Sequence, residues 1–305
     1  MLNPSATYSY IDENHDSSVF PENENKIIYS RIKKIERKSV NKGISVKFVV
    51  HGEEFYRVDQ FPYHVRTGEY LLVNDRRDIQ CNLESESPVE GLCVYLNKDL
   101  IREVYRDLRA SRRIPLDIPM FDVSGRMEIC EHVYKARGNE LGNYLIELSA
   151  RIRQSPNRQL QDLDDIIRTL AEKLIRSQLR VFEQLERLSS TKLSTKKELY
   201  RRLCMARTHI HSNLNDPLDL DTLAQVACLS KFHFIRLFKE VFDQTPRQYL
   251  ITRRLEAASS LLVNSSKSFH EICQEVGLKD SSSFGRLFKR SFGATPHIYR
   301  RIHAG

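Results

Sequence analysis

The sequence lacks several patterns that mark common classes of protein. Its six cysteines are scattered and form no Cys-x-x-Cys pair, so we expect reduced thiols rather than a disulfide framework. No apolar run reaches 18 residues, and the first ten residues are polar and aromatic, which predicts neither a membrane span nor a signal peptide. These absences indicate a cytoplasmic protein without a membrane partner.

Patterns typical of catalysis and of metal binding are missing too. The sequence has no Gly-rich phosphate loop and no Gly-x-Ser-x-Gly elbow. A metal-binding barrel needs two close histidines, a glutamate and a later histidine, but no His-x-His lies between His51 and His64. The triplet His209-Ile210-His211 would point its two rings to opposite sides of a helix. We therefore expect no metal, no cofactor and no enzymatic activity.

Positive charge is concentrated at one end of the chain. The formal net charge is +8, and from Arg201 onward there are 16 Lys and Arg against 9 Asp and Glu, which leaves +7 there and +1 in the first 200 residues. A length of 305 residues gives room for two domains. A basic region beside a near-neutral one predicts a polyanion-binding part and a part with another task, although a merely solvated basic surface has the same composition.

One segment near the end of the chain occurs twice. Residues 236–250 (RLFKEVFDQTPRQYL) recur as residues 286–300 (RLFKRSFGATPHIYR), with eight identical positions. Chance would give about one, so the duplication is real, whereas a solenoid needs at least about three units. The repeat therefore predicts a tandem pair of small helical modules.

Each copy has the pattern of a helix-turn-helix unit, spanning 220–242 and 271–292. In both, a short helix, a turn and a second helix follow one another. Apolar residues three and four apart give the first unit's second helix a buried face: Phe234, Leu237, Phe238 and Val241. A helix that starts at Pro246 is expected to brace the two units through Ile251, Leu255, Ala258 and Leu262.

Together these units resemble the DNA-binding domain of the AraC/XylS family of bacterial transcription regulators, over about residues 203–301. The resemblance is carried by Leu223-Ala224, Ser230, Arg236-Leu237-Phe238-Lys239, Arg254-Leu255, Ala258, Leu261-Leu262, Ile272, Val276-Gly277-Leu278, Phe284, Arg286, Phe288-Lys289, Phe292-Gly293, Thr295-Pro296 and Tyr299. It implies an all-α domain whose two recognition helices enter successive major grooves of double-stranded DNA, about one turn apart. It also implies RNA polymerase as a partner if the protein activates transcription.

Two positions depart between the copies. Cys228 stands where the second copy has Gly277, and Asp243 stands where it has Gly293. A turn there is expected to need a positive φ, which glycine adopts freely, aspartate tolerates and cysteine does not. We therefore expect slight strain at the turn of the first unit.

The outward faces of the two recognition helices supply the candidate DNA contacts. Arg236 can donate two hydrogen bonds to guanine, Phe232 or Ile235 can contact a thymine methyl group, and lysines favour phosphates. The complete set is Lys231, Phe232, His233, Ile235, Arg236, Lys239, Ser281, Ser282, Ser283, Arg286 and Lys289. Alternatively, the arginines form salt bridges within the domain, with Glu240 or Glu275, and Phe232 packs against the protein.

The first half of the chain has short β-type runs separated by turn residues, at 27–29, 46–50, 55–58, 70–73 and 91–96. They predict an antiparallel barrel or sandwich, and the order of strands before helices is similar to the cupin-like sensors of many AraC/XylS proteins. That similarity implies a small-molecule effector of unspecified kind. If a cavity exists, its candidate lining residues are Phe48, Tyr56, Tyr63, His64 and Arg66; alternatively, each belongs to the core or the surface.

A helical stretch is predicted from about residue 140 to 188. Its apolar stripe consists of Leu160, Leu163, Ile167, Leu170, Leu174 and Val181, which follow a seven-residue repeat. The stripe is either the seam of a homodimer or a face that packs on the β-rich part of the same chain.

The predicted fold class is α+β with several domains. We expect a flexible arm at 1–25, a β-rich sensor at 26–135, a helical dimerisation segment at 136–190, a linker at 191–200 and the DNA-binding domain at 201–305. The leading hypothesis is a sequence-specific transcription regulator controlled by a small molecule in its β-rich domain. Two alternatives are a DNA-binding regulator controlled by a protein partner or by its own abundance, and a cupin-type enzyme fused to a DNA-binding domain.

Overall fold

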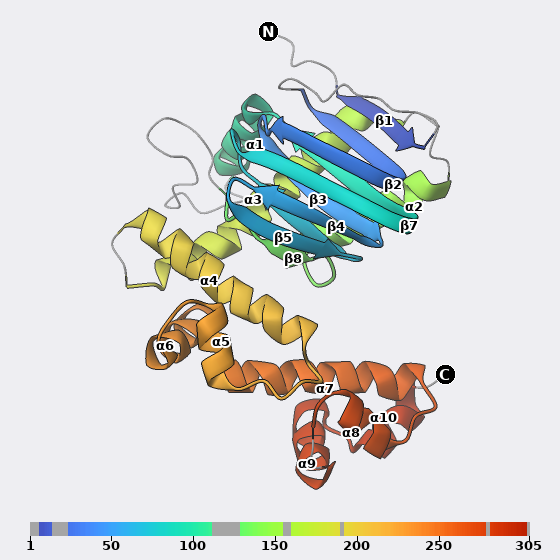
Figure 1. Cartoon of the computed structure of the whole chain (residues 1–305), viewed down its shortest axis with the longest axis vertical. Helices are drawn as coiled ribbons and strands as arrows, with labels where there is room; N and C mark the ends of the chain where they lie inside the picture. Colours follow the sequence, from blue (N-terminus) through green and yellow to red (C-terminus); the bar gives the residue numbers. More distant parts are fainter. Residues whose placement is uncertain are drawn as a thin grey trace. The chain divides into compact units, whose positions relative to one another are not determined.

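The computed structural model describes residues 6–13, 24–111, 129–154, 160–189, 192–278 and 281–303. The chain divides into two compact units, residues 1–183 and 184–305. The first unit contains the strands β1 Thr7–Asp12, β2 Lys26–Val40, β3 Ile44–His51, β4 Glu53–Val58, β5 Phe61–Arg66, β6 Glu69–Val73, β7 Asp78–Leu96 and β8 Val133–Lys135 (Figure 1). It also contains the helices α1 Lys98–Ala110 and α2 Glu140–Gln154, and most of α3 Leu163–Glu186.

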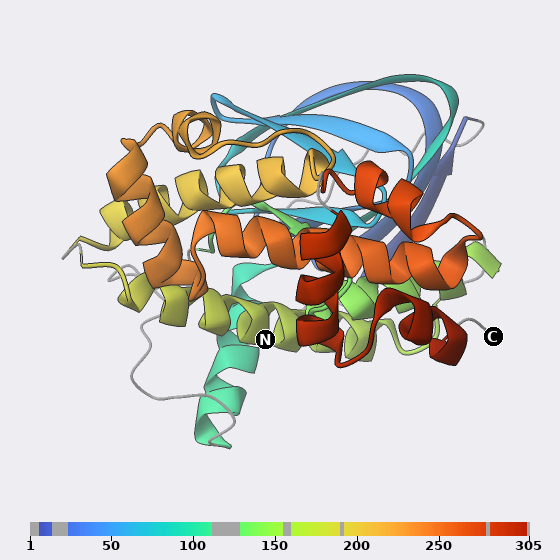
Figure 2. The same ribbon diagram turned by 90° about the horizontal axis from the view of Figure 1, so that it is seen from below.

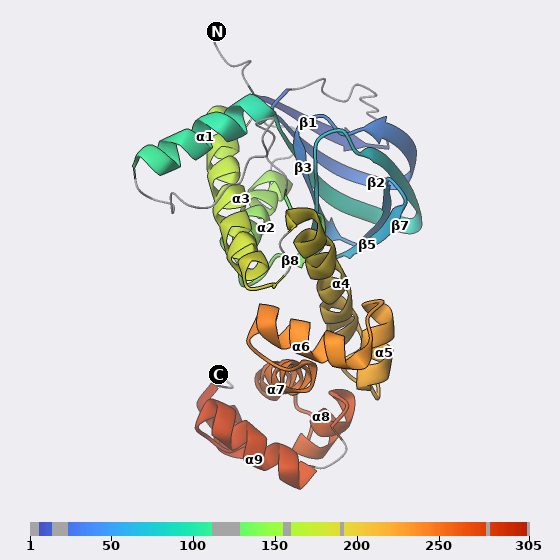
Figure 3. The ribbon, with the colours of Figure 1, turned by 90° about the vertical axis from the view of Figure 1, so that its left-hand side faces the viewer.

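The strands form one curved sheet in the order β1-β2-β7-β3-β6-β8, with β4 paired to β5 and to the beginning of β7 (Figure 3). All pairs are antiparallel except β1–β2, which is parallel, so the expected antiparallel sheet is in fact mixed. Among the described residues no pairing joins the edge strands β1 and β8, so the barrel form of the predicted barrel or sandwich is not confirmed. The α+β class of the chain is confirmed.

An irregularity in β2 decides which of its side chains face the concave side of the sheet. The register against β7 shifts between Ile32 and Lys34. Since side chains alternate along a strand, the shift moves the inward set from even to odd positions, so that Ile32 and Ile35 both face the same cavity. Without it, Lys34 would point inward, where its charge would be buried.

The segment predicted as a flexible arm contains a strand. Residues 7–12 form β1, in register from Thr7 opposite Lys26 to Asp12 opposite Arg31. The Thr7 N–H donates a hydrogen bond to the Asn25 carbonyl oxygen over 3.0 Å. The arm prediction is wrong there because the exposed edge of β2 supplies backbone partners that a polar sequence does not reveal.

The predicted helical stretch is two helices, α2 and α3, and its apolar stripe is buried within the single chain. Ile167, Leu170 and Leu174 are at most 1% exposed, and Val181 is 6% exposed. Leu163 is half-buried, and so is Leu160, which precedes the helix. This is the alternative in which the stripe packs inside the monomer, so it is not the dimer seam.

Ion pairs and a buried amide hold α3 in this position. Arg168 pairs with Glu103 on α1 at 2.7 Å, and Arg180 pairs with Glu140 on α2 at 3.1 Å. Inside the unit, the fully buried Gln178 accepts a hydrogen bond from the Cys130 N–H over 3.0 Å. These contacts fix which side of α3 faces inward.

The second unit is helical. Its elements are α4 Leu193–Ser212, α5 Leu220–Val226, α6 Lys231–Phe242, α7 Pro246–Asn264, α8 Phe269–Glu275, α9 Ser281–Phe292 and α10 Pro296–His303. The predicted linker at 191–200 is wrong from residue 193 onward, because α4 already begins there. Within α4, the Glu198 carboxylate accepts hydrogen bonds from Arg201 and Arg202 at 2.9 and 2.8 Å, pairs that lie three and four residues apart along the helix.

Helix α7 connects two similar helical groups within this unit. The pair α5–α6 packs near its beginning, and α8, α9 and α10 gather along its second half (Figures 1 and 2). Pro246 occupies its first turn, and Thr245 and Gln248 form a reciprocal cap there. The residues Leu255, Ala258 and Leu262 are buried as predicted, and Ile251 is half-buried.

Candidate nucleic-acid interface

The first helix-turn-helix unit consists of α5, a turn at residues 227–230 and α6. Asp219 caps α5 by accepting a hydrogen bond from the Thr222 N–H over 2.7 Å. The four apolar residues expected on the inner face of α6 are at most 2% exposed: Phe234, Leu237, Phe238 and Val241. That prediction is confirmed, and it determines which residues α6 turns outward.

The outward face of α6 is basic with one prominent aromatic ring. Phe232 is 86% exposed, and Lys231, Arg236 and Lys239 are also exposed. His233 and Ile235 are half-buried and lie at the margins of this face. An 86% exposed phenylalanine contributes almost no packing, so the alternative in which Phe232 packs against the protein is wrong.

The ion pairs of this face distinguish its cations. Lys231 lies 2.7 Å from Asp221 on α5, so part of its charge is already neutralised. Within the described parts of the chain, neither Arg236 nor Lys239 has an ion pair or a side-chain hydrogen bond. The predicted alternative of an Arg236 salt bridge with Glu240 is therefore not found, and the guanidinium is available to a ligand.

The second unit repeats this arrangement with α8 and α9. Ser268 and Glu271 form a reciprocal cap at the start of α8. Phe284 and Phe288 of α9 are buried in a cluster shared with α7. Arg286 and Lys289 are exposed, and among the described residues Arg286 donates one hydrogen bond, over 3.3 Å to Ser283.

The three serines predicted as DNA contacts at the start of α9 differ in what the structure describes of them. Ser283 is half-buried. The side chains of Ser281 and Ser282 lie outside the described residues. The second face thus has Arg286 at the position equivalent to Arg236, and Lys289 at the position equivalent to Lys239.

The backbone at the four turn positions confirms the predicted conformation. Gly277 and Gly293 have φ values of 74° and 75°, and at the equivalent positions Cys228 and Asp243 have 50° and 58°. A cysteine in the left-handed region is strained because its Cβ approaches the following carbonyl oxygen. The first helix-turn-helix unit keeps this turn conformation in spite of the strain at Cys228.

Replacing Cys228 by glycine should therefore raise the free energy of unfolding by up to about 1 kcal/mol, since relief of about 1–2 kcal/mol of strain exceeds the entropic penalty of glycine. Urea denaturation followed by circular dichroism measures this. Cys228→Ala is the matched control: it removes the thiol but keeps the Cβ, and should give no gain. Equal stabilisation by both substitutions would mean that the thiol, not the backbone, is the source of strain.

Arg254 of α7 is a structural residue that the sequence singled out only as part of a motif. It is 9% exposed, and its guanidinium donates to the carbonyl oxygens of Leu214 and Asp216, both over 2.7 Å. Burial lowers the pKa of this arginine. These hydrogen bonds hold the loop between α4 and α5 against α7, the helix that connects the two helix-turn-helix units.

Gly277, in the turn of the second unit, meets the same loop. A Cβ added there would lie 2.7 Å from the carbonyl oxygens of Leu214 and Asn215, and 2.8 Å from Nη2 of Arg254. Only a residue without a side chain fits this contact. One close-packed joint is therefore formed by three parts of the helical region: the turn of the second helix-turn-helix unit, Arg254, and the loop that precedes the first helix-turn-helix unit.

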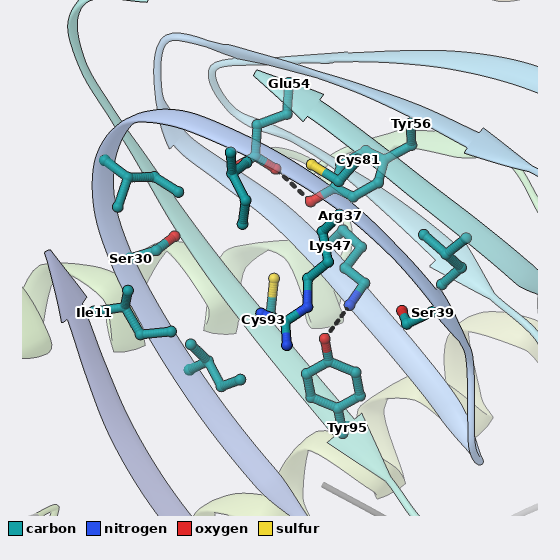
Figure 4. Close-up of a pocket in the computed structure, with 14 residues that line it drawn as sticks. Ile11, Ser30, Arg37, Ser39, Lys47, Glu54, Tyr56, Cys81, Cys93 and Tyr95 are labelled. Carbon is teal, nitrogen blue, oxygen red and sulfur yellow. Dashed lines mark hydrogen bonds between the residues drawn. The ribbon is translucent and has the colours of Figure 1, made fainter. Parts of the chain in front are cut away.

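The first unit of the chain has a cavity on the concave face of its sheet (Figure 4). It is lined by Ile11, Ile28, Ser30, Ile32, Ile35, Arg37, Ser39, Lys47, Glu54, Tyr56, Ile79, Cys81, Cys93 and Tyr95. Of the five predicted lining residues only Tyr56 is among them. Within the described ranges, no group of three or more His, Cys, Asp or Glu side chains could hold a metal ion.

The other four predicted lining residues lie elsewhere for simple reasons. Phe48 follows Lys47 along β3, so its buried side chain points to the opposite face. Tyr63 packs half-buried against a core cluster. His64 stacks on Phe55 and lies 2.6 Å from Glu53, and Arg66 lies 3.9 Å from the same carboxylate. The sequence showed that these residues are aromatic or basic, but not which face of the strand they occupy.

Comparison with known proteins identifies the family to which the helical region belongs. A family model described as a helix-turn-helix domain matches residues 223–302. The chain is 32% identical over 91 residues to the regulatory protein SoxS of Salmonella typhimurium, covering 30% of this chain and 85% of SoxS. The chain belongs to the AraC/XylS family. The resemblance found in the sequence is thereby confirmed.

Other AraC/XylS-type relatives match a similar share of the chain. The MmsAB operon regulatory protein of Pseudomonas aeruginosa is 38% identical over 100 residues, which are 32% of this chain and 31% of that protein. A solved AraC-type transcriptional regulator from Chromobacterium violaceum is 29% identical with a TM-score of 0.33, over 34% of this chain and 92% of that one. The matched region is about a third of the length of the first curated relatives. Among the described residues, no helix is long and apolar enough to cross a membrane.

Proposed function

We propose that this AraC/XylS protein is a sequence-specific DNA-binding transcription regulator whose two helix-turn-helix units each read part of one site. The observation that carries the proposal is the pair of equivalent exposed cations, Arg236 with Lys239 on α6 and Arg286 with Lys289 on α9. Arginine can pair with guanine through two donors, whereas lysine favours phosphate. Each recognition helix therefore has an arginine that can read a base and a lysine that can bind a phosphate and so add affinity.

The length of α7 is consistent with two adjacent grooves. Its 19 residues span about 28 Å at 1.5 Å per residue. Successive major grooves on one face of DNA lie about 34 Å apart. Helix α6 packs on Tyr249 near the beginning of α7, and α9 shares a buried cluster with Leu255, Ala258 and Leu262 in its second half. The joint made by Arg254 and Gly277 would keep the two helices in a constant relative orientation.

In this proposal the remaining residues of the outward faces have secondary roles. Phe232 contacts a thymine methyl group, with Ile235 beside it, and His233 and Ser283 contribute at the margins. Lys231 reaches a phosphate after leaving Asp221. Double-stranded DNA is the main partner, and RNA polymerase is a second one if the protein activates transcription.

We propose further that a small molecule bound in the cavity of the first unit controls the activity. A cavity with a mainly apolar lining and a few polar groups is the usual form of a ligand site. Control would require the ligand to favour one arrangement of the protein over another. A homodimer would have to use a face other than the buried stripe of α3.

Selection of binding sites from random duplex DNA by the full chain, at about 150 mM salt, tests the proposal, since affinity depends strongly on salt. We expect a motif with two elements about one helical turn apart. The selection is repeated with the ligand tested below, in case the free protein is in a non-binding state. Binding without enrichment of any motif under both conditions would indicate a DNA-packaging protein and would refute sequence-specific regulation.

A further inference from the structure

Lys47 is a buried cation with unused hydrogen-bonding capacity. It is 4% exposed, and its Nζ donates to the Tyr95 hydroxyl over 2.6 Å and lies 4.0 Å from the centre of that ring. An ammonium group has three donors, and in the described part of the chain no second acceptor and no carboxylate ion pair is found for this one. A buried ammonium group with unpaired donors is costly, and binding of an anion would lower that cost.

The acidic residue of the cavity does not fill that role. Glu54 is 5% exposed and accepts a 2.5 Å hydrogen bond from the Tyr56 hydroxyl (Figure 4). Its other oxygen lies near Gly91, since a Cβ added at Gly91 would lie 2.7 Å from Glu54 Oε1. Burial raises the pKa of this carboxyl, which favours its neutral form.

The balance of charge in the cavity is positive. Arg37 lines the same space as Lys47, so the lining has two cations against one carboxyl group. The thiols of Cys81 and Cys93 are also there, but burial raises the pKa of both, so they remain neutral. An anionic group on a ligand would therefore be attracted, and an ammonium group repelled.

The rest of the cavity wall is aliphatic. Five isoleucines line it: Ile11, Ile28, Ile32, Ile35 and Ile79. Apolar surface of this kind favours a hydrocarbon part on the ligand, with affinity rising with each buried methylene. The cavity volume of about 90 Å³ restricts the ligand to a compact molecule.

We infer that the cavity binds a short aliphatic monocarboxylate, with its carboxylate on Lys47 and Tyr95 and its hydrocarbon chain among the isoleucines. This inference deepens the proposed control by a small molecule and rests on it for its biological meaning. The binding itself does not depend on DNA and is measured without it.

Calorimetric titration of the full chain with hexanoate, hexan-1-ol and hexylammonium tests the inference. We expect hexanoate to bind at least about tenfold more tightly than the other two, because only the carboxylate combines hydrogen-bond acceptors with a negative charge opposite that of Lys47. Lys47→Met should weaken hexanoate binding about tenfold or more and remove this preference. Binding of hexylammonium as tight as that of hexanoate, or binding of none of the three, would overturn the inference.

Two further variants serve as controls. Lys34 belongs to β2 of the same sheet, but its side chain is 73% exposed and pairs with Glu84 outside the cavity. Lys34→Met should therefore leave hexanoate binding unchanged. Glu54→Gln replaces this carboxyl by a neutral group of the same shape that cannot ionise, and it should leave hexanoate binding as tight or make it tighter. If Lys47→Met does not fold, the ligand preference of the unaltered chain and Glu54→Gln decide, and weaker hexanoate binding by Glu54→Gln would count against the inference.

The outcomes separate this inference from the proposed function. Selective hexanoate binding that leaves DNA binding and promoter activity unchanged would support the carboxylate site and contradict small-molecule control. A two-element DNA motif together with no binding of hexanoate would support the regulator and refute the carboxylate site.

Discussion

Arg236→Ala should weaken binding to the selected site by about 1–3 kcal/mol, roughly five- to 150-fold, and should relax base preference at one position of the first element. The physical reason is that Arg236 is exposed and carries no ion pair within the described residues, so its two donors are free for a guanine. Arg286→Ala should do the same at the second element. Competition binding at constant salt, with each element scrambled in turn, measures both effects.

Lys239→Ala is the matched control on the same face of α6. A phosphate contact carries no sequence information, so this substitution should weaken binding to cognate and random DNA alike and lower the salt dependence by about one unit. The two arginine losses should add when combined, since the residues lie on different helices with no shared partner. Equal weakening of cognate and random DNA by Arg236→Ala would contradict its role in reading a base.

Gly277→Ala should lower the free energy of unfolding of the helical unit by about 2–5 kcal/mol. A positive φ of 74° with a Cβ costs about 1–2 kcal/mol, and forcing that atom to 2.7 Å from two carbonyl oxygens adds about 1–3 kcal/mol of overpacking. Urea denaturation of the full chain followed by far-ultraviolet circular dichroism measures the loss. Binding to the second DNA element should weaken with it.

Gly293→Ala is a closely matched control. Gly293 has nearly the same φ, 75°, but a Cβ there meets no atom within 4 Å. It should therefore show only the backbone contribution of about 1–2 kcal/mol. If the two glycine variants were equally destabilised, the joint between Gly277, Arg254 and the loop at 214–216 would have no energetic role.

The duplicated segment determined the most about this chain, because local patterns alone encode a helix-turn-helix unit. The spacing of Phe234, Leu237, Phe238 and Val241 gave the buried face of α6, and by exclusion the outward one. The comparison of the two copies predicted a positive φ at Cys228, and the structure confirms it. Both follow from interactions within a few residues along the chain.

Long-range contacts could not be derived in the same way. The seven-residue stripe of α3 has the same sequence pattern whether it packs against a second copy or inside its own chain, and only the burial of Ile167, Leu170 and Leu174 in the folded chain distinguishes the two. The strand at 7–12 exists because the edge of β2 is there to receive it. Neither result is encoded locally.

The sequence by itself determined the family, the two units and the residues that face outward from their recognition helices. Only the tertiary structure decided which residues line the cavity, because the register shift in β2 changes the face of every later side chain and no sequence pattern marked it. It also brought Arg254, Gly277 and the loop at 214–216 together from positions far apart in the chain. Periodicity determines a face, whereas the partner of that face depends on how the whole chain folds.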